Sequence, residues 1–138
     1  MTREEAKQQL EAFFQKLGND APVLDEKNFV QARIGEASVG FEFDETDGVL
    51  SCAALIYRFR REPADVILDA LFAEESEANN GGGRIVFDSE TLSLYLQCDF
   101  AEITDDATFY EQVNALALAS MVWNGEIVEH AAAKVSAS

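Results

Sequence analysis

The chain has 138 residues, of which 48% are apolar and 26% charged, and this composition is typical of one globular domain and excludes a disordered chain. The 26 acidic and 10 basic residues give a formal net charge of −16, which argues against nucleic acid or an anionic membrane as a partner. No apolar segment has the pattern of a signal peptide or the length of a membrane span, so we expect a cytoplasmic protein.

The first predicted element is a helix over residues 2–17, because its apolar residues recur at the spacing of one helical face. Thr2 and Glu5 have the spacing of a capping box, and Gly18 follows where a C-terminal cap is expected. Residues 19–25, which include Pro22, are predicted to form a connection.

Three strands are predicted next, over residues 28–34, 38–43 and 49–58. The second strand alternates large apolar and small or polar residues, which predicts one buried face. The third is apolar on both faces, as in the centre of a sheet. Together the strands predict an antiparallel meander.

The segment Arg58-Phe59-Arg60-Arg61 is the only basic cluster in the sequence. Two interpretations remain open for it: a solvated strand end, or a docking site for an acidic element or a second subunit. A helix beginning near Pro63 is then expected to end by about Ser76.

The glycine-rich segment at residues 79–83 is predicted to be a mobile connector, because it follows a helix and precedes a strand, the wrong order for a phosphate-binding loop. A hairpin over residues 84–96 follows, and then a helix from its predicted N-cap Thr104 to about Ile127, with Val113 and Leu116 among the apolar positions at helical spacing. The apolar stripe of this helix is so wide that two expectations remain: the helix is covered on both sides, or it is partly exposed for a partner.

We expect a single domain over residues 1–130 and a frayed tail over residues 131–138. The predicted fold class is therefore α+β, an antiparallel sheet flanked by helices in the order α-β-β-β-α-β-β-α.

No catalytic, cofactor-binding or metal-binding signature is found in the sequence. His130 is the only histidine, and Asp44, Glu45 and Asp47 lack the pattern of a calcium-binding loop. Cys52 and Cys98 lie in apolar strand patterns and are interpreted as core residues of a reduced protein. We therefore expect a protein that is not an enzyme and needs no cofactor or metal.

The order of elements resembles the class I chaperones of bacterial type III secretion over residues 2–128. The segments that carry the resemblance are residues 2–17, 48–52, 89–97 and 109–114, together with size and acidity. The resemblance implies an ATP-independent homodimer that binds an extended N-terminal segment of a secreted effector polypeptide, by strand addition and by apolar grooves.

The resemblance also implies two sets of site residues. The peptide-binding groove would lie between the first helix and the meander, with the candidate residues Phe14, Val39, Phe41, Phe43 and Leu55. Each of these is also interpreted as a core residue, because large residues on one strand face are usually buried. The two-fold dimer interface would use the second helix and the first hairpin strand, with the candidate residues Leu68, Leu71, Phe72, Ile85 and Phe87.

Two alternatives remain from the sequence. One is a regulatory protein-interaction domain of the same fold. The other is an enzyme or small-ligand-binding domain, which would require an enclosed pocket with converging polar groups.

Overall fold

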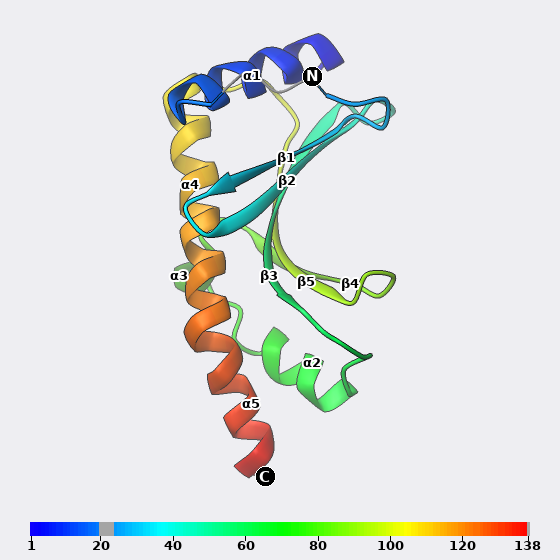
Figure 1. The fold of residues 1–138 in the computed structure, drawn as a ribbon, viewed down its shortest axis with the longest axis vertical. Coiled ribbons are helices and arrows are strands. Elements are labelled where there is room, and N and C mark those ends of the chain that lie inside the picture. Colours follow the sequence, from blue (N-terminus) through cyan, green and yellow to red (C-terminus); the bar gives the residue numbers. More distant parts are fainter. Residues whose placement is uncertain (20–23, 138) are drawn as a thin grey trace.

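A computed structural model describes residues 1–19 and 24–137, so the predicted connection at residues 19–25 falls largely outside the described residues. The strands form one five-stranded antiparallel sheet with the order β1-β2-β3-β5-β4 (Figure 1). Their bounds are Phe29–Ile34 for β1, Ala37–Asp44 for β2, Val49–Arg58 for β3, Arg84–Asp88 for β4 and Ser93–Phe100 for β5. The predicted α+β fold class, the meander and the hairpin are confirmed.

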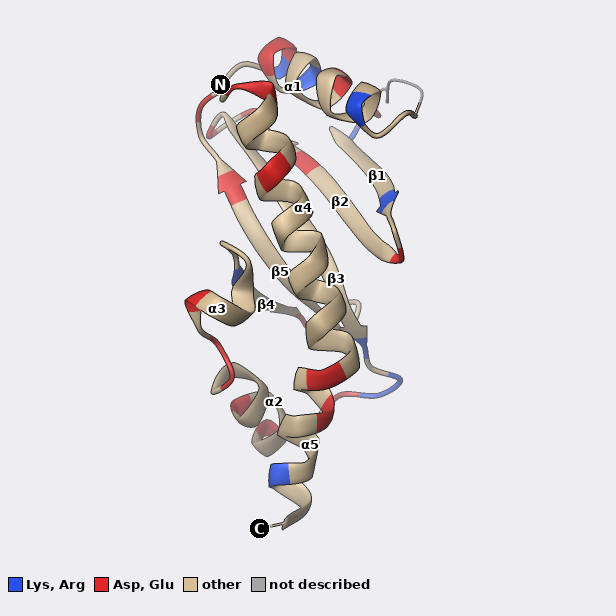
Figure 2. Ribbon diagram, turned by 90° about the vertical axis from the view of Figure 1, so that its left-hand side faces the viewer, with Lys and Arg blue, Asp and Glu red and all other residues tan. Residues whose placement is uncertain are grey.

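The helices are α1 (Arg3–Lys16), α2 (Asp65–Phe72), α3 (Glu77–Asn80), α4 (Asp106–Val122), the π-helical turn η1 (Trp123–Ile127) and α5 (Val128–Ala137). Figure 1 shows α4, η1 and α5 as one long rod, with α1 across one end and α2 beside α5 at the other. Helices α1 and α4 cover one face of the sheet (Figure 2), and the opposite face carries no helix. We call this uncovered surface the open face.

The core lies between the sheet and the helices α1 and α4. Phe13 is at its centre, with its ring 5.6 Å from each of the rings of Phe14, Phe41 and Phe109. All three rings meet the Phe13 ring edge to face, the arrangement that aromatic quadrupoles favour. The predicted inward positions of the long helix, such as Val113 and Leu116, are buried.

The ends of the helices follow from local hydrogen bonds. The capping box predicted at the start of α1 is present, because Thr2 and Glu5 each accept a hydrogen bond from the other's backbone N–H. The prediction that Thr104 caps α4 is wrong. Asp105 is the N-cap, and the Thr104 N–H instead donates to the side chain of Gln9 at 2.9 Å.

Two further segments differ from the sequence-based expectation. The second helix, predicted to run from near Pro63 to about Ser76, ends at Phe72 as α2, and the short helix α3 follows it where a connector was predicted. The backbone carbonyl of Asn79 in α3 accepts a hydrogen bond from the Trp123 indole. Residues 131–137, expected to be frayed, lie in α5, where Ala131 is buried. The division of the chain into a domain of residues 1–130 and a tail remains a prediction, since helical geometry alone does not measure fraying.

The glycine segment 81–83 lies directly against α4. A Cβ atom at Gly83 would be 2.5 Å from a methyl group of Leu116, and one at Gly81 would be 2.6 Å from the carbonyl oxygen of Ala115. Gly81 also has a positive φ of 56° as the C-cap of α3. Glycine is therefore required here by close packing, which the prediction of a mobile connector did not anticipate.

Two irregularities face each other where the sheet meets the C-terminal rod. The pairing of β3 with β5 shifts between Leu55 and Tyr57, which leaves Ile56 at a β-bulge. Opposite this bulge, the π-turn η1 presents Asn124, whose side-chain amide donates to the Ile56 carbonyl oxygen at 2.8 Å. The bulged residue therefore keeps a hydrogen-bond partner for its carbonyl group.

Candidate functional site

Four of the five predicted groove residues lie in the core. Phe14 is on the inner face of α1, and Val39, Phe41 and Phe43 alternate along β2 toward the helices, so all four are buried. These four side chains are therefore core residues, as the sequence also suggested, and they do not line an accessible groove in this structure. Leu55 is the exception, because it lies on the open face.

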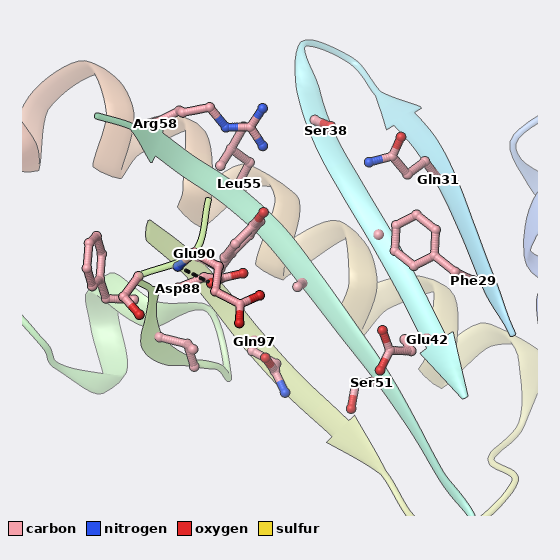
Figure 3. Close-up of a pocket in the computed structure, with 16 residues that line it drawn as sticks. Phe29, Gln31, Ser38, Glu42, Ser51, Leu55, Arg58, Asp88, Glu90 and Gln97 are labelled. Carbon is pink, nitrogen blue, oxygen red and sulfur yellow. Dashed lines mark hydrogen bonds between the residues drawn. The ribbon is translucent and has the colours of Figure 1, made fainter. Parts of the chain in front are cut away.

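The open face forms a concave hollow of about 630 Å³ across all five strands (Figure 3). Side chains of alternate residues project into it from β1, β2 and β5 and along most of β3, while β4 contributes three consecutive residues. The hollow is lined by Phe29, Gln31, Ser38, Gly40, Glu42, Ser51, Ala53, Leu55, Arg58, Val86, Phe87, Asp88, Ser89, Glu90, Tyr95 and Gln97. Apolar and polar side chains therefore share one accessible surface.

The floor of this hollow is shaped by small residues of the central strands. The ring of Phe29 lies over Gly40, since a Cβ atom at Gly40 would be 3.1 Å from the ring. Leu55 and Ala53 provide the apolar part of β3. The floor is thus a shallow apolar strip that a side chain of an extended polypeptide can contact.

Charged residues of both signs border the strip, with carboxylates in the majority. Glu42, Asp88 and Glu90 carry negative charge, and Arg58 is the only basic residue in the lining (Figure 3). The Arg58 guanidinium donates to the Ser93 hydroxyl at 3.0 Å, which fixes it at the end of β3. This balance favours a polypeptide that carries basic residues.

Aromatic side chains and arginines gather where β3 leaves the sheet. The Phe59 ring is 4.9 Å from that of Tyr57 and 6.1 Å from that of Phe87, both in edge-to-face geometry. Basic residues mark the loop that follows β3 (Figure 2), and within the described ranges no carboxylate pairs with Arg60 or Arg61. Tyrosine, phenylalanine and arginine are the residue types that protein interfaces favour. The cluster lies at an exposed strand end, and this position fits both a solvated strand end and a docking site for an acidic element or a second subunit.

The predicted dimer residues divide into a buried and an accessible group. Leu71 and Ile85 are buried within the subunit, whereas Leu68 and Phe87 are partly exposed and Phe72 is 39% exposed. Leu71 and Ile85 are therefore part of the subunit core. A substitution such as Ile85→Asp would destabilise the folded subunit, so its effect on dimerisation could not be separated from its effect on folding. The accessible group lies on α2 and β4, where Val66, which is 59% exposed, adds to the apolar surface of α2.

Helix α4 carries a second accessible apolar surface. Leu118, Met121 and Val122 are exposed and lie at a spacing of three and four residues along the helix. Of the two expectations for this wide apolar stripe, partial exposure is the one observed. We refer to these three residues as the outer stripe of α4.

The single histidine belongs to a small charged cluster at the C-terminal end of the rod. His130 is exposed and lies 3.6 Å from Glu74, which also forms an ion pair with Lys134 at 2.8 Å. The hydrogen bond from Lys134 lowers the pKa of Glu74, so this carboxylate is ionised as a structural partner. Within residues 1–19 and 24–137, no three His, Cys, Asp or Glu side chains are grouped to hold a metal ion. No helix in the described ranges is long and apolar enough to cross a membrane.

Comparisons with known proteins relate the fold to secretion complexes. No protein-family model matches the chain, and no curated protein matches its sequence. A chain of the ExsC–ExsE complex superposes with a TM-score of 0.72 at 16% identity, over 90% of this chain and 95% of that chain. A chain of the HopA1–SchA chaperone–effector complex gives a TM-score of 0.68 at 15% identity, over 88% of this chain and 94% of that chain.

A third similar structure comes from an identified organism. A chain of the heterodimeric ExoU–SpcU complex, from the type III secretion system of Pseudomonas aeruginosa, gives a TM-score of 0.58 at 14% identity, over 83% of this chain and 94% of that chain. The protein therefore has the fold found in complexes of type III secretion chaperones. This confirms the fold that the family resemblance implied.

Sequence reasoning did not assign the polar face of the sheet to a site. The alternation of Ser38, Gly40 and Glu42 with buried residues of β2 predicted a solvated face, and that face is the hollow. The contribution of Phe29 and Tyr95 depends on bringing β1 and β5 to either side of the β2–β3 hairpin. The alternation was therefore a usable signal, whereas the order of the strands was not visible in the sequence.

Proposed function

We propose that the protein is a non-enzymatic, ATP-independent chaperone that binds an extended segment of a secreted effector polypeptide as a homodimer. The observation that carries this proposal is the shared fold, which extends over 88% of this chain and 94% of a chain of a chaperone–effector complex. Broad apolar surfaces on α2, α4 and the open face support a role in binding a polypeptide.

The proposed polypeptide-binding surface is the open face together with the edge strand β1. Strand β1 pairs only with β2 among the described strands, so its outer edge offers backbone groups for strand addition. Phe29 and Leu55 would contact apolar side chains of the added segment, and Glu42 would contact basic ones. Phe14, Val39, Phe41 and Phe43 would contribute only by supporting β2 from the core.

The proposed dimer interface comprises the exposed apolar residues of α2 together with Phe87 of β4. Val66, Leu68 and Phe72 lie on α2, and an isologous contact would bury each of them twice around a two-fold axis. Leu71 and Ile85 would support this surface from beneath without touching the partner.

Light scattering tests the dimer. The expected mass is twice the 15.2 kDa of the chain, and Phe72→Asp is expected to weaken the dimer by at least about tenfold because it places a charge in an apolar contact. Leu118→Asp is the matched control, since it adds the same charge on the outer stripe of α4 and should leave the mass unchanged. A wild-type chain that is monomeric at all accessible concentrations would overturn the homodimer.

Pull-down from the native host, with recovered polypeptides identified by mass spectrometry, tests the chaperone role. A secreted polypeptide should be recovered through its N-terminal segment, ATP should not release it, and Leu55→Asp should reduce its recovery severalfold. Recovery of only non-secreted regulators would favour the alternative of a regulatory interaction domain. If Leu55→Asp recovers as much polypeptide as wild type, the polypeptide does not bind at the open face.

A further inference from the structure

Two cysteines lie directly opposite each other on neighbouring central strands. Cys52 of β3 and Cys98 of β5 are Cα partners in the antiparallel register, so their side chains point to the same face of the sheet. Partners in antiparallel strands have Cα atoms about 4.5–5.5 Å apart, which lies within the range of about 4.4–6.8 Å found in disulfides. The Cα spacing of the pair is therefore compatible with a disulfide.

The two thiols differ in their access to solvent. Cys52 is 0% exposed, whereas Cys98 is partly exposed and lines a second hollow of about 500 Å³. Gly81 and Gly82 form part of the wall of this hollow, and without side chains they leave the approach to Cys98 open. A small oxidant can therefore reach the sulfur of Cys98 but not that of Cys52.

Hydrogen bonding gives the two sulfurs different chemical character. Hydrogen bonding between the two side chains raises the pKa of Cys52 and lowers the pKa of Cys98. Burial raises the pKa of Cys52 further. At Cys98 the hydrogen bond to Cys52 is the largest influence and the pKa is lowered, while burial and Asp99 oppose the thiolate and Arg84 favours it. The accessible sulfur is thus the nucleophile and the buried one holds the proton.

We propose that Cys52 and Cys98 form a peroxide-responsive dithiol that closes reversibly to a disulfide within one subunit. In the first step the Cys98 thiolate attacks one oxygen of hydrogen peroxide, the O–O bond breaks, and the departing hydroxide takes a proton to leave as water. In the second step the Cys52 sulfur attacks the resulting sulfenic acid of Cys98, and the S–O bond breaks. The proton of Cys52 and the hydroxide leave together as a second water, so one peroxide oxidises both thiols.

Reversal requires a thiol reductant, which attacks the disulfide through a mixed-disulfide intermediate. Attack at Cys98 is the accessible route, because Cys98 lines the hollow and is partly exposed, whereas Cys52 is fully buried. Cβ atoms of directly opposed residues are about 4.5–5.5 Å apart, slightly wider than the spacing of about 3.5–4.5 Å in disulfides, so the bond would draw β3 and β5 together.

Treatment of the purified chain with hydrogen peroxide tests the proposal. Intact mass should fall by two hydrogens, non-reducing peptide mapping should join the peptides that contain Cys52 and Cys98, and dithiothreitol should restore the thiols. In Cys52→Ser the reaction should stop at a sulfenic acid on Cys98 that dimedone traps, whereas Cys98→Ser should react with peroxide at least about tenfold more slowly than wild type. Cys52→Ala provides a second variant if serine in the core prevents folding.

Two results would overturn the proposal. One is oxidation of Cys98 to sulfinic acid in the wild-type chain without a bond to Cys52. The other is a disulfide between two subunits through Cys98 only. The same treatment in urea serves as the control for geometry, since an unfolded chain should form the bond at least about tenfold more slowly when the register no longer holds the thiols together.

Discussion

At the residue scale, Asp105 determines how α4 begins. Its side chain accepts hydrogen bonds from the backbone N–H and the hydroxyl of Thr108, at 2.9 Å and 2.7 Å. The backbone hydrogen bond from Thr108 is the main reason why the pKa of Asp105 is lowered. The carboxylate also lies at the positive end of the helix dipole.

The lowered pKa predicts a pH-dependent contribution of Asp105 to stability. A depressed folded-state pKa stabilises the native state fully above the unfolded-state value, and this contribution is lost as pH falls through the folded-state value. The difference in unfolding free energy between wild type and Asp105→Ala should therefore be largest near neutral pH and should shrink under acid conditions. Urea titrations at several pH values measure it, with Asp106→Ala as the control. A difference that grows as pH falls would contradict the assignment.

At the scale of elements, the contact between the glycine segment and α4 sets the packing of β4 and β5 against the rod. Gly83 would place a Cβ atom 2.5 Å from Leu116 and 3.0 Å from the carbonyl oxygen of Gln97. Leu116 is fully buried, so it has little room to move away.

Gly83→Ala is expected to lower the unfolding free energy by about 1–3 kcal/mol, the usual range for overpacking. Gly125→Ala is the matched control, because no atom lies within 4 Å of the added methyl group and the site is helical. This control should be neutral or stabilise by up to about 1 kcal/mol. Thermal and urea denaturation compare the two, and equal effects would contradict a packing role for Gly83.

Local patterns predicted the elements, and contacts between distant residues explain the exceptions. Alternation in β2 and the helical spacing of Val113 and Leu116 predicted which side chains enter the core. The position of the cap at Asp105 instead of Thr104 depends on Gln9, which is remote in sequence and accepts the Thr104 N–H. No local pattern carries that information.

At the scale of the whole molecule, negative charge is the dominant electrostatic property. The net charge is −16, and the described part of the chain contains only four ion pairs, one of them to a histidine. Repulsion among carboxylates therefore outweighs the attraction of these mostly exposed pairs.

Screening of this repulsion predicts that salt stabilises the protein. The melting temperature should rise as sodium chloride increases from low concentration, because the Debye length shortens to about 8 Å at physiological ionic strength. The rise should level off within a few hundred millimolar, whereas stabilisation through exclusion of solute continues to increase. Circular dichroism melting curves across a salt series measure this. A falling melting temperature would mean that the ion pairs dominate.

The candidate site was less predictable than the fold, because it depends on contacts between elements that are distant in sequence. The accessible surface depends on which face of the sheet α1 and α4 cover, a tertiary property. Leu50 and Leu55 both lie in the apolar strand β3, yet Leu50 is in the core and Leu55 lines the hollow. Only the assembled sheet distinguishes them.

The facing bulge at Ile56 and π-turn at residues 123–127 have a consequence for how such chains diverge. Each irregularity accommodates one residue more than a regular strand or α-helix would, and the hydrogen bond from Asn124 to Ile56 joins them. Deleting one residue from either segment alone would leave the other without its partner. Homologous chains should therefore gain or lose these two insertions together, as a correlated pair of gaps in segments that are distant in sequence.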